Sequence, residues 1–72
     1  MILQRIFAEN VLFLRKEMGI SQEKLAEICG YHRTYIGAIE RGERNVTLST
    51  IEALSFAFGI KPYQLLVPNK NG

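Results

Sequence analysis

The 72-residue sequence contains no aspartate and no tryptophan, and it has one cysteine and one histidine. A single cysteine excludes an internal disulfide and a cysteine-based zinc site, and His32 has no partner ligands for another metal. The acidic residues are all glutamates, and they are not clustered as a metal-dependent nuclease requires. The sequence therefore predicts no metal, no cofactor and no enzymatic activity.

Glycine-rich loops and long apolar runs are missing as well. The six glycines stand singly, so there is no phosphate-cradling loop and no glycine-framed turn around a nucleophilic serine. The longest apolar run, Val11 to Leu14, is too short to span a bilayer, and the first residues lack the zones of a secretory signal. We therefore expect no membrane association and a cytoplasmic protein. The net charge of +2 permits nucleic-acid binding but does not require it.

What the sequence does contain is helical periodicity, and it contains no strand signal. Ser21 and Thr47 are suited to cap two helices, Gly30 and Gly59 to end them, and Pro62 to start a short fifth helix through Leu66. The expected buried stripes are Phe7, Val11, Leu14 and Met18; Leu25, Ala26 and Cys29; Ile36 and Ile39; and Leu48, Ile51, Leu54 and Phe58. The prediction is one all-α domain of five helices over residues 1–72, with a frayed tail at 68–72.

The segment from Gln22 to Ile39 carries the functional signal. Two helices of about eight residues meet at Gly30-Tyr31-His32, a turn of the length that sets helices at a steep angle. A small residue at Ala26 allows close approach of the second helix. This pattern resembles the helix-turn-helix of the phage-repressor-like family, and the resemblance extends from about Arg15 to Leu66.

The third helix has a face suited to a DNA groove. Thr34, Gly37, Ala38 and Arg41 lie opposite Ile36 and Ile39, with Arg33 beside them near the N-terminus. Small residues in the middle allow the helix to sit deep in a major groove, where arginine grips guanine and threonine meets a base edge. Arg33 and Thr34 are predicted to read bases. Tyr35 borders this face and is also placed among the base-reading residues, with packing at the edge of the face as the alternative.

Positioning contacts to the DNA backbone are expected around the same helix. Gln22 matches the phosphate-contacting position of the resembled family, and His32 stands at the helix start near a phosphate. In the loop that follows, Arg41 and Asn45 are predicted backbone contacts. Arg44 is predicted to read a base, although a solvated loop whose glutamates cancel its arginines is the alternative.

Two further expectations concern the fold and its assembly. Arg15 and Glu40 match a pair that bridges the first and third helices in the resembled family, which implies a structural ion pair here. Phe56 lies opposite the buried stripe of its helix, and the first helix has a second apolar cluster in Ile2, Ile6 and Phe13. We expect a homodimer centred on Phe56 and Tyr63, because members of the family bury their fourth and fifth helices in a dimer.

The string from His32 to Gly37, followed by Ile39 to Asn45, is similar to the controller proteins of restriction–modification systems. In that group the residues matching Arg33, Thr34, Tyr35, Arg44 and Asn45 meet the operator. Phe56 departs from the group, where a polar residue is commoner. The resemblance implies a dimeric regulator that recruits RNA polymerase to its own gene and the endonuclease gene, then represses both at high concentration.

Other functions are compatible with the same segment. A phage-type repressor or an antitoxin-like regulator would keep the DNA-facing surface but work with another partner. A protein-interaction module on the same scaffold would not need the small, hydrogen-bonding face of the third helix.

Overall fold

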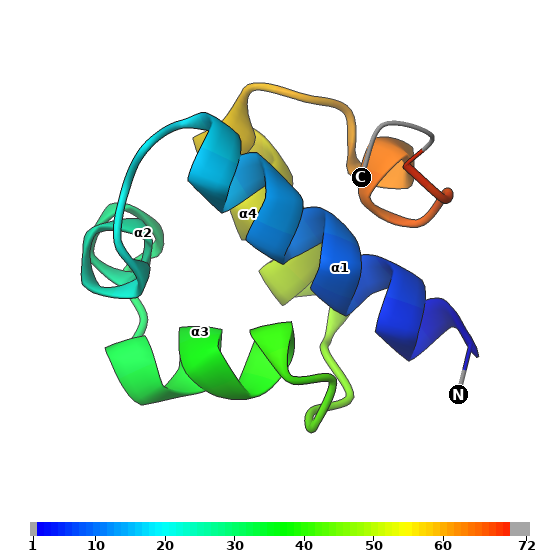
Figure 1. Ribbon diagram of the computed structural model, residues 1–72, viewed down its shortest axis with the longest axis horizontal. Helices are drawn as coiled ribbons and strands as arrows, with labels where there is room; N and C mark the ends of the chain where they lie inside the picture. Colours follow the sequence, from blue (N-terminus) through cyan, green and yellow to red (C-terminus); the bar gives the residue numbers. More distant parts are fainter. Residues whose placement is uncertain (1, 70–72) are drawn as a thin grey trace.

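The computed structural model describes residues 2–69 as four α-helices followed by one 3₁₀-helix (Figure 1). The elements are α1 (Ile2–Glu17), α2 (Gln22–Cys29), α3 (Arg33–Glu40), α4 (Leu48–Phe58) and η1 (Pro62–Leu65). No strand occurs within these residues, so the expected all-α class is confirmed. The predicted fifth helix is a 3₁₀-helix, because its hydrogen bonds span three residues, as in the bond from Leu66 N to the Tyr63 carbonyl at 2.9 Å. It ends at Leu65, one residue before the predicted end.

The predicted capping residues determine where α2 and α4 begin. Ser21 accepts a hydrogen bond from the Lys24 amide at 3.0 Å, and Thr47 accepts one from the Thr50 amide at 3.2 Å. Gly30 ends α2 with φ at +78°, a left-handed conformation that a side chain would strain. These local signals fix where α2 and α4 start and where α2 turns toward α3.

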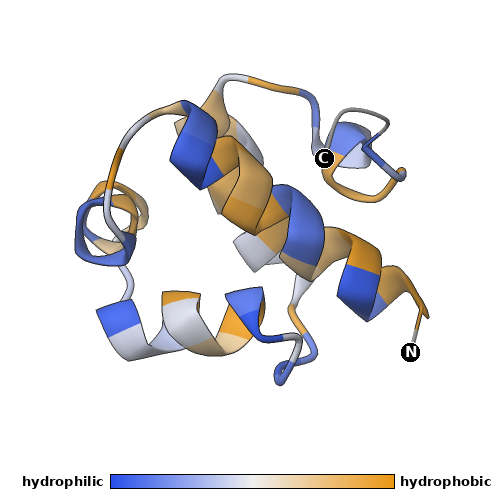
Figure 2. Ribbon diagram, in the orientation of Figure 1, coloured by the Kyte–Doolittle hydropathy of each residue, from blue (hydrophilic) through white to orange (hydrophobic). Residues whose placement is uncertain are grey.

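One apolar core holds all five elements together. Figure 2 shows hydrophilic and hydrophobic residues alternating along α1, as expected for a helix with one side in the core. The core residues are Phe7, Val11, Leu25, Ala26, Ile36, Ile39, Leu54 and Leu65. Every element contributes at least one of these core residues. Packing against the other elements therefore fixes the orientation of α3.

Two residues of the predicted stripes are exposed. Met18 lies beyond the last residue of α1, where the chain turns toward Gly19, and its side chain leaves the stripe. Leu48, the first residue of α4, is 84% exposed, whereas Thr50 in the same turn is buried. Both predictions were wrong at helix ends, where periodicity no longer decides direction.

The last described residues are fastened to α1. The buried Asn10 side chain donates hydrogen bonds from Nδ2 to the carbonyls of Leu65 and Val67, both at 2.8 Å. Pro68 and Asn69 then line a groove beside α1. The rest of the tail predicted to fray, residues 70–72, lies outside the described residues. Within residues 2–69, no helix is both long and apolar enough to span a membrane.

Candidate nucleic-acid interface

The helices α2 and α3 form the expected helix-turn-helix. In Figure 1, α2 is seen nearly end-on while α3 is seen lengthwise, so the two axes cross steeply. The Tyr31 amide donates to the Ala26 carbonyl at 2.9 Å, which closes the turn between them. Ile36 and Ile39 bury the inner face of α3 against the core. The remaining surface of α3 is therefore held in a fixed orientation.

The N-terminal end of α3 is open to solvent. His32 caps the helix, with Nδ1 accepting from the Thr34 amide at 3.1 Å and lying 2.8 Å from the Thr34 hydroxyl. Because Nδ1 accepts, the imidazole proton is on Nε2, where it is available for an outside acceptor. Arg33 and Thr34 are both exposed. The structure thus brings three of the predicted contact residues together at one exposed helix start.

The C-terminal end of α3 is tied to two other helices through Glu40. Arg15 of α1 donates from Nε to Glu40 Oε2 at 2.7 Å and from Nη2 to Oε1 at 3.1 Å, so the predicted ion pair is present. Gln22 of α2 donates to the same Oε1 at 2.9 Å. The Arg15 and Glu40 side chains are only 13% and 4% exposed. Glu40 is therefore fully used in holding the helices together.

The helical wheel predicts that Gly37 lies on an open surface, but in the structure Gly37 is buried. The side chains of Gln22 and Arg41 fold over it, and a Cβ added at Gly37 would lie 3.1 Å from Arg41 Nη1 and 3.4 Å from Gln22 Oε1. Two predicted backbone-contact residues therefore meet above the middle of α3. The small residue makes room for them and does not itself face a groove.

Arg41 is exposed and paired with Glu43, with 3.0 Å between Nε and Oε2. The hydrogen bond that Arg41 donates to Glu43 and the negative charge of Glu43 raise the pKa of Arg41, so this guanidinium is charged throughout the pH range of the folded protein. The pair is open to water on both sides, and salt screens it. Arg41 can therefore exchange Glu43 for another anion.

Tyr35 connects α3 to both α4 and the loop that precedes it. Its hydroxyl lies 3.1 Å from Oγ1 of the buried Thr50, and its ring packs edge-to-face on Tyr31. The Arg44 guanidinium lies over the same ring, 5.3 Å from its centre. The Tyr35 hydroxyl can accept a hydrogen bond from Thr50 and still donate its own proton to an outside acceptor.

Thr50, which contacts the Tyr35 hydroxyl, was not predicted from the sequence. Its Oγ1 also lies 3.2 Å from the Thr47 hydroxyl and 3.4 Å from the Tyr31 hydroxyl. A threonine three residues after a capping threonine was the available signal, because both side chains face the first turn of the helix. The remaining predicted loop residue, Asn45, is exposed.

Phe56 and Tyr63, the residues predicted to form the dimer, lie on α4 and η1. Phe56 of α4 is 88% exposed and Tyr63 of η1 is 61% exposed. Such large apolar side chains in water are typical of surfaces that a partner covers. Ile28, Leu48 and Val67 add to the exposed apolar surface.

Within residues 2–69, no three histidine, cysteine or acidic side chains are grouped as metal ligands. Cys29 is half-buried with its sulfur 3.9 Å from the Ala53 carbonyl, and burial raises the pKa of its thiol, which keeps it protonated.

Residues 13–65 match the helix-turn-helix family model, and the chain belongs to this family. Its sequence is 53% identical over 66 residues to the control protein C.SmaI of Serratia marcescens, covering 92% of this chain and 79% of C.SmaI. The predicted similarity to restriction–modification controller proteins is thereby confirmed.

Two solved structures extend the comparison. The restriction–modification controller protein C.AhdI from Aeromonas hydrophila is 42% identical with a TM-score of 0.82, over 86% of this chain and 94% of that one. The controller protein C.Esp1396I, solved as a tetramer in complex with its natural 35 base-pair operator, is 29% identical with a TM-score of 0.82. That match covers 90% of this chain and 86% of C.Esp1396I.

Proposed function

We propose that this protein is a sequence-specific regulator of transcription that binds double-stranded DNA as a homodimer, and that it controls a restriction–modification system without catalysing a reaction. The observation that carries the proposal is the start of α3, where Arg33 and Thr34 are exposed on a helix whose other face is locked into the core. The similarity to control proteins supports the same function.

In this proposal α3 enters the major groove of the operator. Arg33 donates two hydrogen bonds to a guanine, and Thr34 contacts a neighbouring base edge or a thymine methyl. Arg44 reads a further base from the loop, and the Tyr35 ring holds its guanidinium in position beforehand. Holding a long side chain before binding lowers the entropy lost in the complex.

Four residues position the protein on the phosphate backbone. Gln22 and Arg41 meet above Gly37 and face one phosphate together, while His32 donates from Nε2 and Asn45 from its amide. The free N-terminal amides of α2 add to the attraction for an anion. These contacts supply affinity without sequence preference.

The dimer forms through Phe56 and Tyr63, which removes their apolar surface from water. A two-fold axis there places two copies of α3 about one turn of DNA apart, so the operator is palindromic. At low concentration the bound dimer recruits RNA polymerase, and at high concentration a second dimer on a weaker site blocks it. This action takes place in the cytoplasm.

Selection of bound duplexes from a random DNA pool near physiological salt tests the proposal. We expect a palindrome with half-sites about one helical turn apart. The matched control is the double variant Arg33→Ala/Thr34→Ala, which keeps the core and should bind without enrichment. Absence of enrichment with the wild-type protein contradicts the proposal and favours a protein-interaction module.

Sedimentation tests the dimer separately. The wild-type protein should sediment as a dimer at micromolar concentration, and Phe56→Ser should shift it toward the monomer. A wild-type monomer, unchanged by Phe56→Ser, removes the dimer from the proposal.

A further inference from the structure

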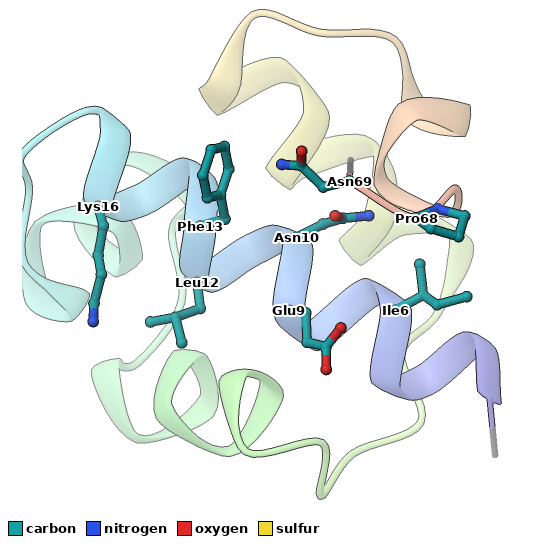
Figure 3. A pocket seen from close by; sticks show the side chains of 8 residues that line it. All are labelled: Ile6, Glu9, Asn10, Leu12, Phe13, Lys16, Pro68 and Asn69. Carbon is teal, nitrogen blue, oxygen red and sulfur yellow. The ribbon is translucent and has the colours of Figure 1, made fainter. Parts of the chain in front are cut away.

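The outward side of α1 carries a surface that neither the DNA contacts nor the α4 contact uses. Phe7 and Val11 bury the opposite side of this helix in the core. On the outward side, a shallow groove of about 450 Å³ is lined by Ile6, Glu9, Leu12, Phe13 and Lys16 together with Pro68 and Asn69 (Figure 3). Ile6, Leu12 and Phe13 on this face are only partly buried, so bulky apolar side chains remain in contact with water there.

The charges on this face are arranged symmetrically. Glu9 and Lys16 are seven residues apart, which is two helical turns, and both are exposed. Within residues 2–69 neither has an ion-pair partner. In Figure 3 both extend from one side of α1 with Leu12, while Ile6 and Phe13 extend from the other side. The face therefore has one charged edge and one apolar edge.

We propose that α1 binds α1 of a second copy of this chain, antiparallel, across a two-fold axis that passes between Leu12 and Phe13. Glu9 and Lys16 are equally distant from that point along the helix. In an antiparallel pair each Glu9 therefore faces Lys16 of the other copy, and two ion pairs form at once. The same axis keeps the apolar edges together, so Ile6 and Phe13 of both copies share one patch.

The charge pattern selects a second copy as the occupant. An isologous contact requires a surface complementary to itself, and a glutamate and a lysine placed symmetrically about two bulky apolar residues meet that requirement. This inference rests on the proposed function for its role, because the α4 contact makes the dimer and the α1 contact joins one dimer to the next. Two dimers on neighbouring sites of one DNA then hold each other at high effective concentration, so a weak contact suffices.

Sedimentation equilibrium at low salt tests the contact in the Phe56→Ser background, where the exposed α4 residue no longer contributes. We expect this variant to form a dimer in the millimolar range through α1 alone. Glu9→Lys or Lys16→Glu should each weaken that association by roughly ten-fold, because two attractive pairs become repulsive. The swap Glu9→Lys/Lys16→Glu should restore it, because both pairs form again with their signs exchanged.

Glu17→Lys is the matched control, because it makes the same charge change on an exposed residue of α1 that does not line the groove. It should leave the association unchanged. A strictly monomeric Phe56→Ser protein overturns the proposal, and so does a charge swap that is as weak as either single reversal. Neither result affects the selected palindrome, so failure of the α1 contact is distinguishable from failure of DNA binding.

Discussion

At its N-terminal end α3 is bonded within its own first turn, whereas at its C-terminal end it is tied to two other helices. His32 and Thr34 bond to each other, and Arg33 extends into solvent. Glu40 receives donors from Arg15 of α1 and Gln22 of α2. The same eight-residue helix thus has one open end and one anchored end.

The difference shows how a small domain can present a helix without loosening it. A core of this size leaves little stability to spare, so an exposed helix needs a firm attachment elsewhere. The attachment lies seven residues away from Arg33, about two turns along the helix. Substitutions at the two ends should therefore separate stability from DNA binding.

The largest expected effect is at the anchored end. Glu40→Gln removes the charge that compensates the nearly buried Arg15, and we expect the free energy of unfolding to fall by about 3 kcal/mol. Urea denaturation followed by circular dichroism measures it. Unchanged stability together with tighter DNA binding would show that Glu40 is not a structural anchor.

At the open end the effect should be on DNA alone. Arg33→Ala is expected to cost roughly 1–3 kcal/mol of binding on the selected operator and little on random duplex. Stability should stay at the wild-type value, because Arg33 is exposed. Equal losses on the two DNAs would remove Arg33 from the base-reading residues.

Tyr35 lies between the two ends and should affect both quantities. Tyr35→Phe keeps the ring under Arg44 but removes the hydroxyl beside Thr50, so we expect a loss of about 1 kcal/mol in stability. Operator affinity should change little, because Arg44 stays in place. A large loss of affinity with stability intact would instead assign the hydroxyl to a base.

The phosphate contacts should respond to salt. Arg41→Ala is expected to weaken binding to the operator and to random duplex, and to reduce the slope of log affinity against log salt by about 1. Gln22→Ala should weaken binding to operator and random DNA alike without changing the slope, because the amide is uncharged. Fluorescence anisotropy titrations across a salt series distinguish the two.

The smallest expected effect is at the exposed pair. Glu43→Gln makes the same chemical change as Glu40→Gln, but Glu43 and Arg41 are open to water, so the melting temperature should not move. Binding to random duplex should tighten slightly, because Arg41 loses a competing anion. A clear drop in melting temperature would remove the contrast between the two pairs.

Much of the fold was predictable because its signals are local. Ser21 and Thr47 cap the helices they were expected to cap, and Gly30 turns the chain between α2 and α3. A residue's own backbone chemistry decides these features. Leu48 was misplaced because its burial depends on which side of the start of α4 another element covers.

The site was predictable as a set of residues but not as a set of contacts. The exposure of Arg33 and Thr34 follows from the period of α3. The burial of Gly37 does not, because Arg41 reaches back over it from the next turn. The bond between Tyr35 and Thr50 joins residues of two helices, and spacing within one helix carries no information on it.

The hydrogen bonds of Asn10 determine when the domain can complete its folding during synthesis. Its amide holds the carbonyls of Leu65 and Val67, which lie 55 and 57 residues further along the sequence. During synthesis the first helix leaves the ribosome long before those carbonyls do, so Asn10 must remain hydrated until Leu65 and Val67 have emerged. The domain therefore closes late and as a unit, and a product shortened before Leu65 would expose a polar group where the finished protein has a sealed core.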